Sequence, residues 1–204
     1  TWHSPILLEG TFGHYVWRTT TFNGKAYLCG RRKTNFAVGP KGEGQQVQSL
    51  MLESDDGLIW RRRSVFQEVA GDETAFLFEP DGQVLGVGRR RGTAQLLRSR
   101  PPYAQWERSD LDRSIGGPLL VKWGDRYLIG GRDSTPDRGP KTAFWWLVGD
   151  RLHACAELPS GGDNSYPGFV ELSPGHALVS YYSSHERDAS GKPFTAVYLA
   201  ELTY

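Results

Sequence analysis

The chain has 204 residues, of which 38% are hydrophobic, and its 24 Lys and Arg balance 23 Asp and Glu to a formal net charge of +1. This balance creates no global field that would favour nucleic acid or an anionic membrane surface as a partner. The longest apolar runs are only strand-sized, so no membrane-spanning helix is expected. The 25 Gly and 12 Pro interrupt the chain too often for a helical protein, and seven Trp and nine Tyr favour an all-β fold.

A strand–turn–strand unit recurs four times along the chain. Each copy has an apolar strand, a tight turn that contains Gly, and a second apolar strand that ends in polar or cationic residues. Asn-Gly and Asp-Gly dipeptides predict two-residue hairpin turns, because such turns need positive φ angles. In chain order the copies span residues 16–32, 74–91, 118–132 and 168–182, with turn glycines Gly24, Gly82, Gly124 and Gly175.

Further strand-like runs follow each of these hairpins. The first three hairpins are followed by two runs each, at 48–53 and 59–65, at 94–98 and 106–110, and at 142–148 and 152–158; the fourth is followed by 195–204 alone. Four antiparallel strands in each unit of about 40 to 60 residues are typical of a β-propeller blade. The predicted fold is therefore an all-β propeller of four-stranded antiparallel blades, with a β-sandwich as the alternative.

The repeat divides the chain into one propeller domain with four blades. The predicted blades are 15–71, 72–115, 116–164 and 165–204, the last of which lacks its outer strand. Residues 1–14 are predicted to be the outer strand of a preceding blade, which favours part of a six-bladed ring over a compact four-bladed one. In the four-bladed alternative, the apolar segment 6–9 supplies the missing strand of the fourth blade. Both cysteines, Cys29 and Cys155, lie in apolar runs and are expected to be buried thiols, with a disulfide as the alternative.

Arginines occupy equivalent places in three of the hairpins. Arg31 and Arg89 each follow their turn glycine by seven residues, and Arg132 follows its own by eight. Equivalent positions in successive propeller blades lie on the same face, so these cations are expected to converge on one region. Arg binds a carboxylate or phosphate bidentately, which predicts an anion site there. The alternative for any single one is an ordinary solvated strand-end charge.

Glu73 and Tyr166 each stand just before or at the start of a first strand, which places them on one rim of the predicted propeller. A tyrosine beside a carboxylate can act as a nucleophile, with the glutamate taking the phenol proton. The alternative is that Tyr166 only packs against its neighbours and that Glu73 balances the charge of Arg89.

Several segments resemble the sialidase superfamily, the neuraminidases with BNR or Asp-box repeats, from about Tyr15 to the end of the chain. The segment 54–60, Ser-Asp-Asp-Gly-Leu-Ile-Trp, resembles an Asp box, which is a marker of the blade fold and carries no catalysis. In such a hairpin the Asp and Ser make hydrogen bonds within the turn and the Trp fills the gap between blades. Other segments that carry the resemblance are 15–18, 73–74, 116–118, 131–132, 159–168 and 180–186.

This resemblance implies a glycoside hydrolase that acts on a terminal acidic sugar. In sialidases three arginines clamp the substrate carboxylate, a Tyr/Glu pair forms the nucleophile, and an Asp is the acid/base. A neutral Tyr suits this substrate, because the carboxylate on the anomeric carbon would repel an anionic nucleophile. By position, Tyr166 resembles the nucleophile, Glu73 its partner, and Arg89 and Arg132 two of the arginines; further candidates for substrate binding are Arg90, Arg18, Asp163, Tyr182 and His185.

The first arginine and the acid/base Asp of the sialidases find no match in this chain. Asp163 and Asp133 are carboxylates near the predicted site, but neither stands at the acid/base position. The alternative functions are a non-catalytic carbohydrate-binding propeller and a protein-interaction platform. The expected partner is a carbohydrate, an anionic sugar rather than nucleic acid, and neither a metal nor another cofactor is predicted. For a sialidase-like protein, a secreted or periplasmic location is expected.

Overall fold

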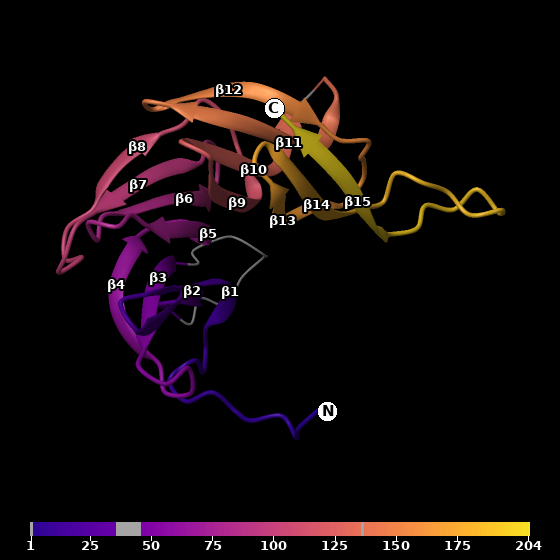
Figure 1. The fold of residues 1–204 in the computed structure, drawn as a ribbon. Coiled ribbons are helices and arrows are strands. Elements are labelled where there is room, and N and C mark those ends of the chain that lie inside the picture. Colours follow the sequence, from indigo (N-terminus) through magenta and orange to yellow (C-terminus); the bar gives the residue numbers. More distant parts are fainter. Residues whose placement is uncertain (1, 36–45, 136) are drawn as a thin grey trace.

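The computed structural model describes residues 2–35, 46–135 and 137–204. Within these residues all regular structure is β: fifteen strands form four antiparallel sheets, each with its strands in chain order. The sheets follow one another around an arc as blades of a β-propeller (Figure 1). The predicted fold class is therefore confirmed.

The strands have the following bounds. Blade 1 contains β1 (Tyr15–Phe22), β2 (Lys25–Lys33), β3 (Val47–Ser54) and β4 (Arg61–Gln67). Blade 2 contains β5 (Gly71–Phe78), β6 (Val84–Arg90), β7 (Gln95–Ser99) and β8 (Glu107–Asp110). Blade 3 contains β9 (Gly116–Trp123), β10 (Arg126–Thr135), β11 (Gly139–Val148) and β12 (Arg151–Glu157). Blade 4 contains β13 (Asn164–Ser173), β14 (His176–Ser183) and β15 (Ala196–Thr203).

All four predicted hairpins form, and three of them have two-residue turns; at Asp81-Gly82 the loop is longer than predicted, since Phe78 pairs with Val84 and Glu79 with Gln83. In the β1–β2 turn Phe22 pairs with Lys25, and the two residues between them, Asn23 and Gly24, have φ angles of 48° and 73°. Asn and Gly are the residues that tolerate two successive positive φ angles at least cost. Each hairpin places its first strand toward the axis of the propeller, where β1, β5, β9 and β13 contact one another in sequence.

Apolar side chains form a separate core at each junction between neighbouring blades. Tyr27, Met51 and Phe66 of blade 1 pack against blade 2, and Trp145 of blade 3 belongs to the core shared with blade 2. A third core joins blades 3 and 4. The face of blade 4 that points away from blade 3 is not covered by another blade of the described chain. Val197 is 76% exposed, and three further apolar side chains of this blade are exposed: Val170, Leu172 and Leu199.

Phe66 offers a test of how strongly the first two blades depend on each other. Its ring is fully buried and lies 5.0 Å from that of Phe76 and 4.9 Å from that of Trp106, measured between ring centroids, and both partners are in blade 2 or beside it. We expect Phe66→Ala to lower the free energy of unfolding by about 3–5 kcal/mol, because it opens a cavity in this core. Urea unfolding followed by Trp fluorescence measures the change, and a loss below about 1 kcal/mol would contradict this account of the junction.

The segment 6–9 does not complete blade 4, contrary to one expectation from the sequence. Glu9 instead forms a parallel bridge with Ile59, and its amide donates to the carbonyl of Leu58 in blade 1. Leu8 packs beside Trp60, which belongs to a small core on the outer face of blade 1. Trp60 therefore fills the space between its own blade and this N-terminal segment.

The turn that contains Trp60 is organised by Ser54 and Asp56. The Ser54 hydroxyl donates to the Asp56 carboxylate, which accepts the amides of Leu58 and Ile59, and the Trp60 indole donates to the carbonyl of Gly57. The hydrogen bonds of Ser54 and Asp56 lie within the turn as expected, whereas Trp60 packs against the N-terminal segment and not against a neighbouring blade.

The two cysteines are both free thiols, and only one is buried as expected. Burial raises the pKa of Cys29 to about 11, whereas Cys155 is exposed because it lies on β12, the edge strand of blade 3. No helix of sufficient length and hydropathy to cross a membrane occurs in the described parts of the chain.

Candidate functional site

Tyr166 is held on an irregular stretch of β13 beside the propeller axis. The pairing of β13 with β14 shifts register between Ser165 and Gly168, and Ser165 and Tyr166 have φ angles of 155° and 51°. Such values are rare for residues with a side chain and persist only when the surroundings hold them. The Ser165 hydroxyl donates to the carbonyl of Gly116, and a Cβ added to Gly117 would lie 2.4 Å from the Ser165 oxygen. Close packing between β9 and β13 therefore sets the direction of the Tyr166 side chain.

The Tyr166 hydroxyl donates a hydrogen bond to the carboxylate of Glu73 on β5, 93 residues earlier in the chain. Glu73 is only 5% exposed, and its carboxylate also accepts two hydrogen bonds from Arg89 Nη1, at 2.8 and 3.0 Å. The amide of Gly117 is the third donor and adds a fourth hydrogen bond, at 2.9 Å. Three elements, β5, β6 and β9, thus fix the carboxylate against the phenol of β13.

The environment keeps Glu73 ionised and Tyr166 protonated at neutral pH. Burial alone would raise the pKa of Glu73, but the hydrogen bonds from Tyr166 and Arg89, with the charge of Arg89, outweigh it and hold the pKa below its ordinary value of 4.5. Burial raises the pKa of Tyr166, and the adjacent Glu73 carboxylate raises it further; a hydrogen bond with the Trp17 side chain acts in the opposite direction. The pair is therefore a neutral phenol whose hydroxyl donates a hydrogen bond to an ionised carboxylate.

Arg18 of β1 lies beneath this pair and bridges three inner strands. Its Nη2 donates to the carbonyl of Pro167 at 2.7 Å, and its Nε donates to that of Pro118 at 3.2 Å. Burial lowers the pKa of Arg18, and within the described residues no carboxylate pairs with it. Arg18 also lines a cavity of about 680 Å³ between the inner strands. It thus leaves a positive charge close to Tyr166 that no acidic side chain of the described residues neutralises.

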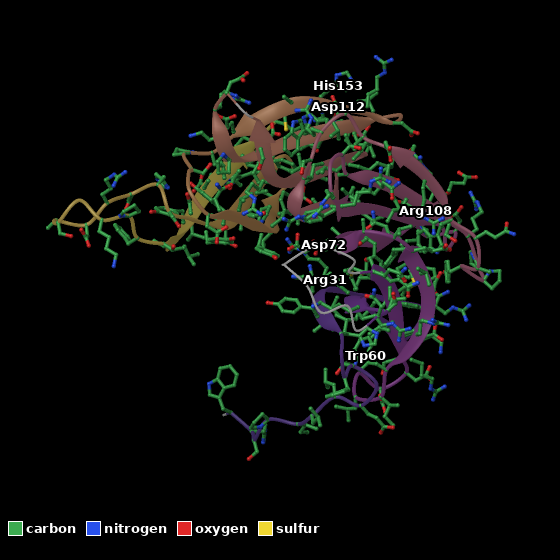
Figure 2. The ribbon with its side chains drawn as sticks, turned by 180° about the vertical axis from the view of Figure 1, so that it is seen from behind. Arg31, Trp60, Asp72, Arg108, Asp112 and His153 are labelled. Carbon is green, nitrogen blue, oxygen red and sulfur yellow. The ribbon has the colours of Figure 1, made fainter. Side chains whose placement is uncertain are left out.

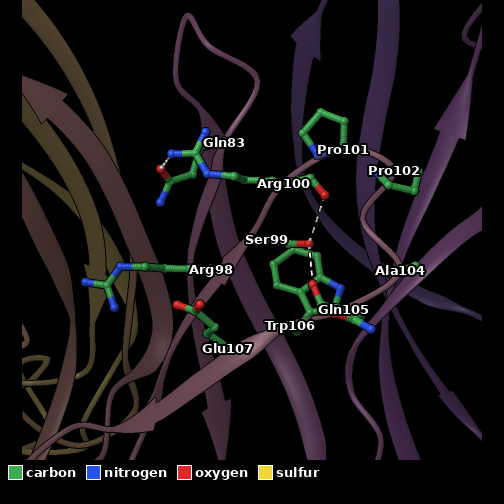
Figure 3. A pocket seen from close by; sticks show the side chains of 10 residues that line it. All are labelled: Gln83, Arg98, Ser99, Arg100, Pro101, Pro102, Ala104, Gln105, Trp106 and Glu107. Atoms are coloured by element: carbon green, nitrogen blue, oxygen red, sulfur yellow. Dashed lines mark hydrogen bonds between the residues drawn. The ribbon is translucent and has the colours of Figure 1, made fainter.

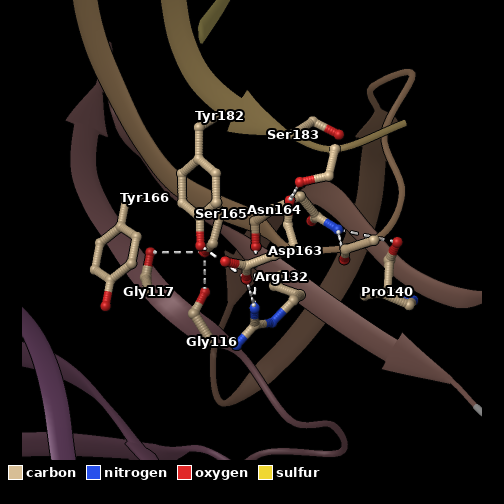
Figure 4. A network of polar contacts seen from close by, with 12 residues as sticks. Gly116, Gly117, Arg132, Pro140, Asp163, Asn164, Ser165, Tyr166, Tyr182 and Ser183 are labelled. Atoms are coloured by element: carbon tan, nitrogen blue, oxygen red, sulfur yellow. Dashed lines mark hydrogen bonds and ion pairs between the residues drawn. The ribbon is translucent and has the colours of Figure 1, made fainter. Parts of the chain in front are cut away.

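Arg132, Asp163 and Tyr182 form a second polar group beside Tyr166 (Figure 4). Arg132 Nη1 donates to Asp163 at 2.8 Å and to the carbonyl of Asn164 at 3.3 Å, and the Tyr182 hydroxyl donates to Asp163 at 3.0 Å. The rings of Tyr166 and Tyr182 are stacked with their centroids 6.0 Å apart. Asp163 is largely exposed. The predicted residues Arg89, Arg132, Glu73, Tyr166, Asp163, Tyr182 and Arg18 are therefore brought together.

Arg90 and His185 lie in other surroundings. Arg90 Nη2 pairs with Asp110 of β8 at 3.3 Å, since neighbouring residues of a strand point to opposite faces of the sheet. His185 contacts the Ser183 hydroxyl at 2.9 Å, and its ring lies 4.7 Å from that of Tyr198. Asp133 is buried near Arg113 and Arg138, at 3.9 and 4.0 Å. None of these three has a hydrogen bond to the Tyr166 pair among the described residues.

Three contributors to the site were not identified from the sequence. Asp72 pairs with Arg31 at 2.8 Å and accepts the amide of Glu73 at 3.0 Å (Figure 2 labels Arg31 and Asp72). Gly117 contributes its backbone amide, and Trp17 contacts the Tyr166 hydroxyl. Asp72 could have been identified from its position next to Glu73. The sequence contains no pattern that identifies a backbone donor such as Gly117 or a contact across the propeller axis such as that of Trp17.

A separate hollow of about 540 Å³ lies around the loop between β7 and β8 (Figure 3). Its arginines are already engaged, since Arg98 pairs with Asp150 and Arg100 pairs with Asp81 and Gln83. It contains no nucleophile beside a base, which makes it a weaker candidate than the Tyr166 pair. In the described ranges no group of three or more His, Cys, Asp or Glu side chains could hold a metal ion.

Comparisons with known proteins support the fold. No protein-family model matches the chain, and no curated protein is a significant match. Among solved structures, a protein of unknown function from Dyadobacter fermentans DSM 18053 is similar with a TM-score of 0.73 and 16% identity over 100% of this chain and 61% of that one. The α-L-arabinofuranosidase Arb93A of Fusarium graminearum has a TM-score of 0.65 and 13% identity over 97% and 66%.

A third similar structure is a xylan β-1,4-xylosidase from Bacillus halodurans C-125, with a TM-score of 0.62 and 13% identity over 95% of this chain and 43% of that one. The chain thus spans less than two thirds of each of these proteins. At these identities the likeness shows a shared fold, the β-propeller that glycoside hydrolases also use. Neither of the two enzymes is a sialidase, so these structures support a propeller of the kind found in glycoside hydrolases and do not support the predicted resemblance to the sialidase superfamily.

Proposed function

We propose that this protein is a sialidase-like glycoside hydrolase that acts on a terminal acidic sugar, with Tyr166 as nucleophile and Glu73 as its base. The observation that carries the proposal is the hydrogen bond from the Tyr166 hydroxyl to a buried carboxylate that also accepts three hydrogen bonds from two other donors, Arg89 and the amide of Gly117. A nucleophile and base in direct contact, with the base oriented by a third group, is the usual arrangement of covalent catalysis.

The reaction would proceed in two steps. The Tyr166 oxygen attacks the anomeric carbon, its proton passes to Glu73, and the bond to the leaving group breaks. Water then attacks the same carbon, the bond to Tyr166 breaks, and Glu73 returns the proton to the phenolate as water loses one to solvent. Two displacements at one carbon retain its configuration. A leaving group of low basicity, such as a nitrophenolate, needs no proton donor in the first step.

An acidic substrate is supported by the charges around Tyr166. Arg89 and Arg132 each keep guanidinium nitrogens beyond the one bound to Glu73 or Asp163, and Arg18 has no acidic partner within the described chain. Guanidinium groups bind a carboxylate with two parallel hydrogen bonds. We therefore expect Arg132 and Arg89 to contact the sugar carboxylate, with Arg18 contributing its charge from below.

Turnover of nitrophenyl glycosides tests the proposal without relying on an acid catalyst. The acidic panel contains α-glycosides of N-acetylneuraminic acid and related 2-keto acids, and the neutral panel contains the matching xyloside and arabinofuranoside. We expect turnover of at least one acidic glycoside, and labelling of Tyr166 by a 3-fluoro acidic glycosyl fluoride, detected by peptide mass. A folded protein that hydrolyses no acidic glycoside, or only the neutral ones, would contradict the proposal.

The activity should depend on pH through Glu73 alone over a wide range. Because the pKa of Glu73 is held below 4.5 and that of Tyr166 is raised, Glu73 is ionised and Tyr166 is neutral from about pH 5 to pH 10. We expect kcat/KM for the nitrophenyl glycoside to be level across neutral pH and to fall only below about pH 4.5 as Glu73 gains a proton. A profile that falls between pH 6 and pH 8 would exclude this base.

A carbohydrate-binding propeller without hydrolysis is the second candidate. It is favoured by the group of Tyr182, Asp163 and Arg132, which offers polar atoms and an aromatic ring without needing the Tyr166 hydroxyl. In that case acidic-sugar binding, measured by calorimetry, should survive Tyr166→Phe and fall with Arg132→Ala, while no glycoside is cleaved. The larger ring predicted from the blade repeat also stays a proposal, supported by the uncovered apolar side chains of blade 4.

A further inference from the structure

Glu73 lies in a β-bulge of blade 2. The pairing of β5 with β6 shifts register between Gly71 and Thr74. The two residues between them, Asp72 and Glu73, lie opposite a single residue of β6, Arg89. Such a bulge interrupts the regular alternation of side chains and turns one of them in a new direction. The direction of the Glu73 carboxylate toward the nucleophile therefore depends on what fixes this bulge.

Ser49 of β3, in blade 1, contacts both ends of the bulge. A Cβ added to Gly71 would lie 2.4 Å from the amide nitrogen of Ser49, so the backbone of β5 passes directly against β3 there. At the other end the hydroxyls of Thr74 and Ser49 share a hydrogen bond of 2.7 Å. The contact between blades 1 and 2 thus sets where the bulge begins and where it ends.

Inside the bulge, Asp72 joins the proposed base to blade 1. Its Oδ1 accepts one hydrogen bond from Arg31 Nη1 at 2.8 Å and another from the amide of Glu73 at 3.0 Å (Figure 2 labels Arg31 and Asp72). Arg31 is itself the partner of Ser49 in the pairing of β2 with β3. One carboxylate oxygen therefore fixes the backbone of Glu73 and is fixed in turn by an arginine of the neighbouring blade.

Arg31 also neutralises a charge that would act against Glu73. Asp72 is a second carboxylate directly beside the base, and a neighbouring like charge favours the protonated form of Glu73. The Arg31 guanidinium is held in place from its other side, because it lies over the rings of Tyr15 and Trp17 at 5.7 and 5.6 Å from their centroids. The ion pair therefore supports both the position and the ionised state of Glu73.

We propose that Arg31 and Asp72 are positioning residues, which hold the bulge that directs the Glu73 carboxylate at the Tyr166 hydroxyl. This inference rests on the proposed function, because it assigns a role in that reaction to two residues outside the reacting pair. Glu73 and Tyr166 belong to blades 2 and 4. The geometry of the pair thus depends on blade 1 as well, through the junction between blades 1 and 2.

The other charged and titratable groups near Glu73 remain when Arg31 or Asp72 is substituted. Arg18 of β1 adds its charge close to the phenol of the pair. The groups that interact with Glu73 itself come from four strands: Cys29 of β2, Arg89 of β6, Tyr166 of β13 and Tyr182 of β14. A change in the titration of Glu73 can therefore be assigned to the ion pair.

Steady-state kinetics on the nitrophenyl acidic glycoside separate positioning from substrate binding. We expect Asp72→Ala to lower kcat about tenfold with KM within about twofold of wild type, because the base is displaced while the contacts to the sugar remain. Asp72→Asn keeps an oxygen that accepts the Glu73 amide and should retain most of the wild-type kcat. An unchanged kcat in Asp72→Ala, equal losses in the two variants, or a raised KM with kcat unchanged would overturn the positioning role.

Carboxyl-carbon NMR of protein with labelled glutamate follows Glu73 without any turnover, and the signal is assigned by its absence in Glu73→Gln. In the wild type we expect Glu73 to titrate below its ordinary pKa of 4.5. In Arg31→Met the titration should move up by about half a pH unit or more, because Asp72 loses its counter-charge and the bulge loses its anchor. An identical titration in both proteins contradicts the inference.

Asp150→Ala is the matched control for both measurements. Asp150, in the β11–β12 turn of blade 3, also pairs with an arginine of another blade, Arg98, at 2.6 Å, and makes no hydrogen bond to Glu73 or Tyr166 among the described residues. It should leave kcat and the Glu73 titration unchanged; losses equal to those of Asp72→Ala would reveal a general effect of ion pairs between blades and refute the specific one.

Failure of the positioning role and failure of the hydrolase give different results. If the wild type cleaves no acidic glycoside, the proposed function is wrong, and the NMR comparison alone decides whether the ion pair of Arg31 and Asp72 controls Glu73. If the wild type is active and the variants match it in kcat and in the Glu73 titration, the hydrolase stands and the positioning role is wrong.

Discussion

Tyr166→Phe is expected to reduce kcat for a nitrophenyl acidic glycoside on the order of 10³-fold or more, with KM little changed. The substitution removes only the oxygen that would attack the anomeric carbon. The ring that stacks on Tyr182 remains, and Glu73 keeps its hydrogen bonds from Arg89 and Gly117. The lost hydrogen bond is worth about 1 kcal/mol of stability, so the variant should fold.

Tyr181→Phe is the matched control for this measurement. Tyr181 is the neighbour of Tyr182 on β14, and its hydroxyl donates to the carbonyl of Pro159 at 2.9 Å on the face that packs against blade 3. It should lose a similar hydrogen bond and keep wild-type turnover. If Tyr166→Phe retains more than about a tenth of wild-type kcat, the nucleophile is another group and the proposed mechanism is wrong.

Arg89→Met is expected to lower both stability and activity. Arg89 is the charged partner of a nearly buried carboxylate, and the substitution leaves Glu73 with neutral donors only. Loss of one member of a buried ion pair costs about 3–5 kcal/mol; because Arg89 is itself about a third exposed, we expect about 2–3 kcal/mol. Turnover should fall about 10²-fold or more, because Glu73 loses the guanidinium that fixes its carboxylate against the Tyr166 hydroxyl, and the proposed anion site loses one of its arginines.

The pH dependence of the stability loss in Arg89→Met identifies the cause of that loss. In the wild type the folded-state pKa of Glu73 is lowered, so its contribution to stability is present above the unfolded-state pKa and disappears as the pH falls through the folded-state pKa. The deficit of Arg89→Met should therefore be largest at neutral pH and shrink as the pH falls through the lowered folded-state pKa of Glu73, where the wild type loses the same contribution. Urea unfolding at pH 7 and pH 3.5 measures it.

Arg98→Met is the matched control for Arg89→Met, because both arginines lie in the sheet of blade 2. Arg98 pairs with Asp150 at 2.6 Å, but Asp150 is half exposed, so removing this ion pair should cost below about 1 kcal/mol and leave turnover unchanged. Equal losses in Arg89→Met and Arg98→Met, or a deficit for Arg89→Met that is the same at both pH values, would contradict a special role for the Glu73 pair.

The strands were predictable because their signals are local. A turn such as Asn23-Gly24 requires positive φ angles whatever surrounds it, and alternating apolar residues on either side define the strands of the hairpin. The same repeat placed Glu73 and Tyr166 on one rim, because equivalent positions of a propeller share a face. Composition, hairpins and blade order therefore follow from the residues themselves.

The predictions from the sequence were wrong where the pairing or burial of a segment depends on the tertiary structure around it. The segment 6–9 is a short apolar run with no pattern that selects between two sheets, and the core around Trp60 decided for blade 1. Cys155 lies between two alanines in the sequence, but β12 is an edge strand, and the Cys155 side chain is exposed. Neither burial nor pairing can be read from a run of five residues when both faces of the strand are possible.

By itself the sequence determined an all-β propeller with a balanced charge and with a tyrosine, a glutamate and two arginines on a common rim. Only the tertiary structure decided that the Tyr166 hydroxyl meets Glu73, that the amide of Gly117 and Arg89 keep that carboxylate charged, and that Arg90 turns away to Asp110. The physical reason is distance along the chain. Contacts between blades depend on how the cores at three junctions set the curvature of the arc, and the strained backbone at Ser165 and Tyr166 exists only because β9 packs against it.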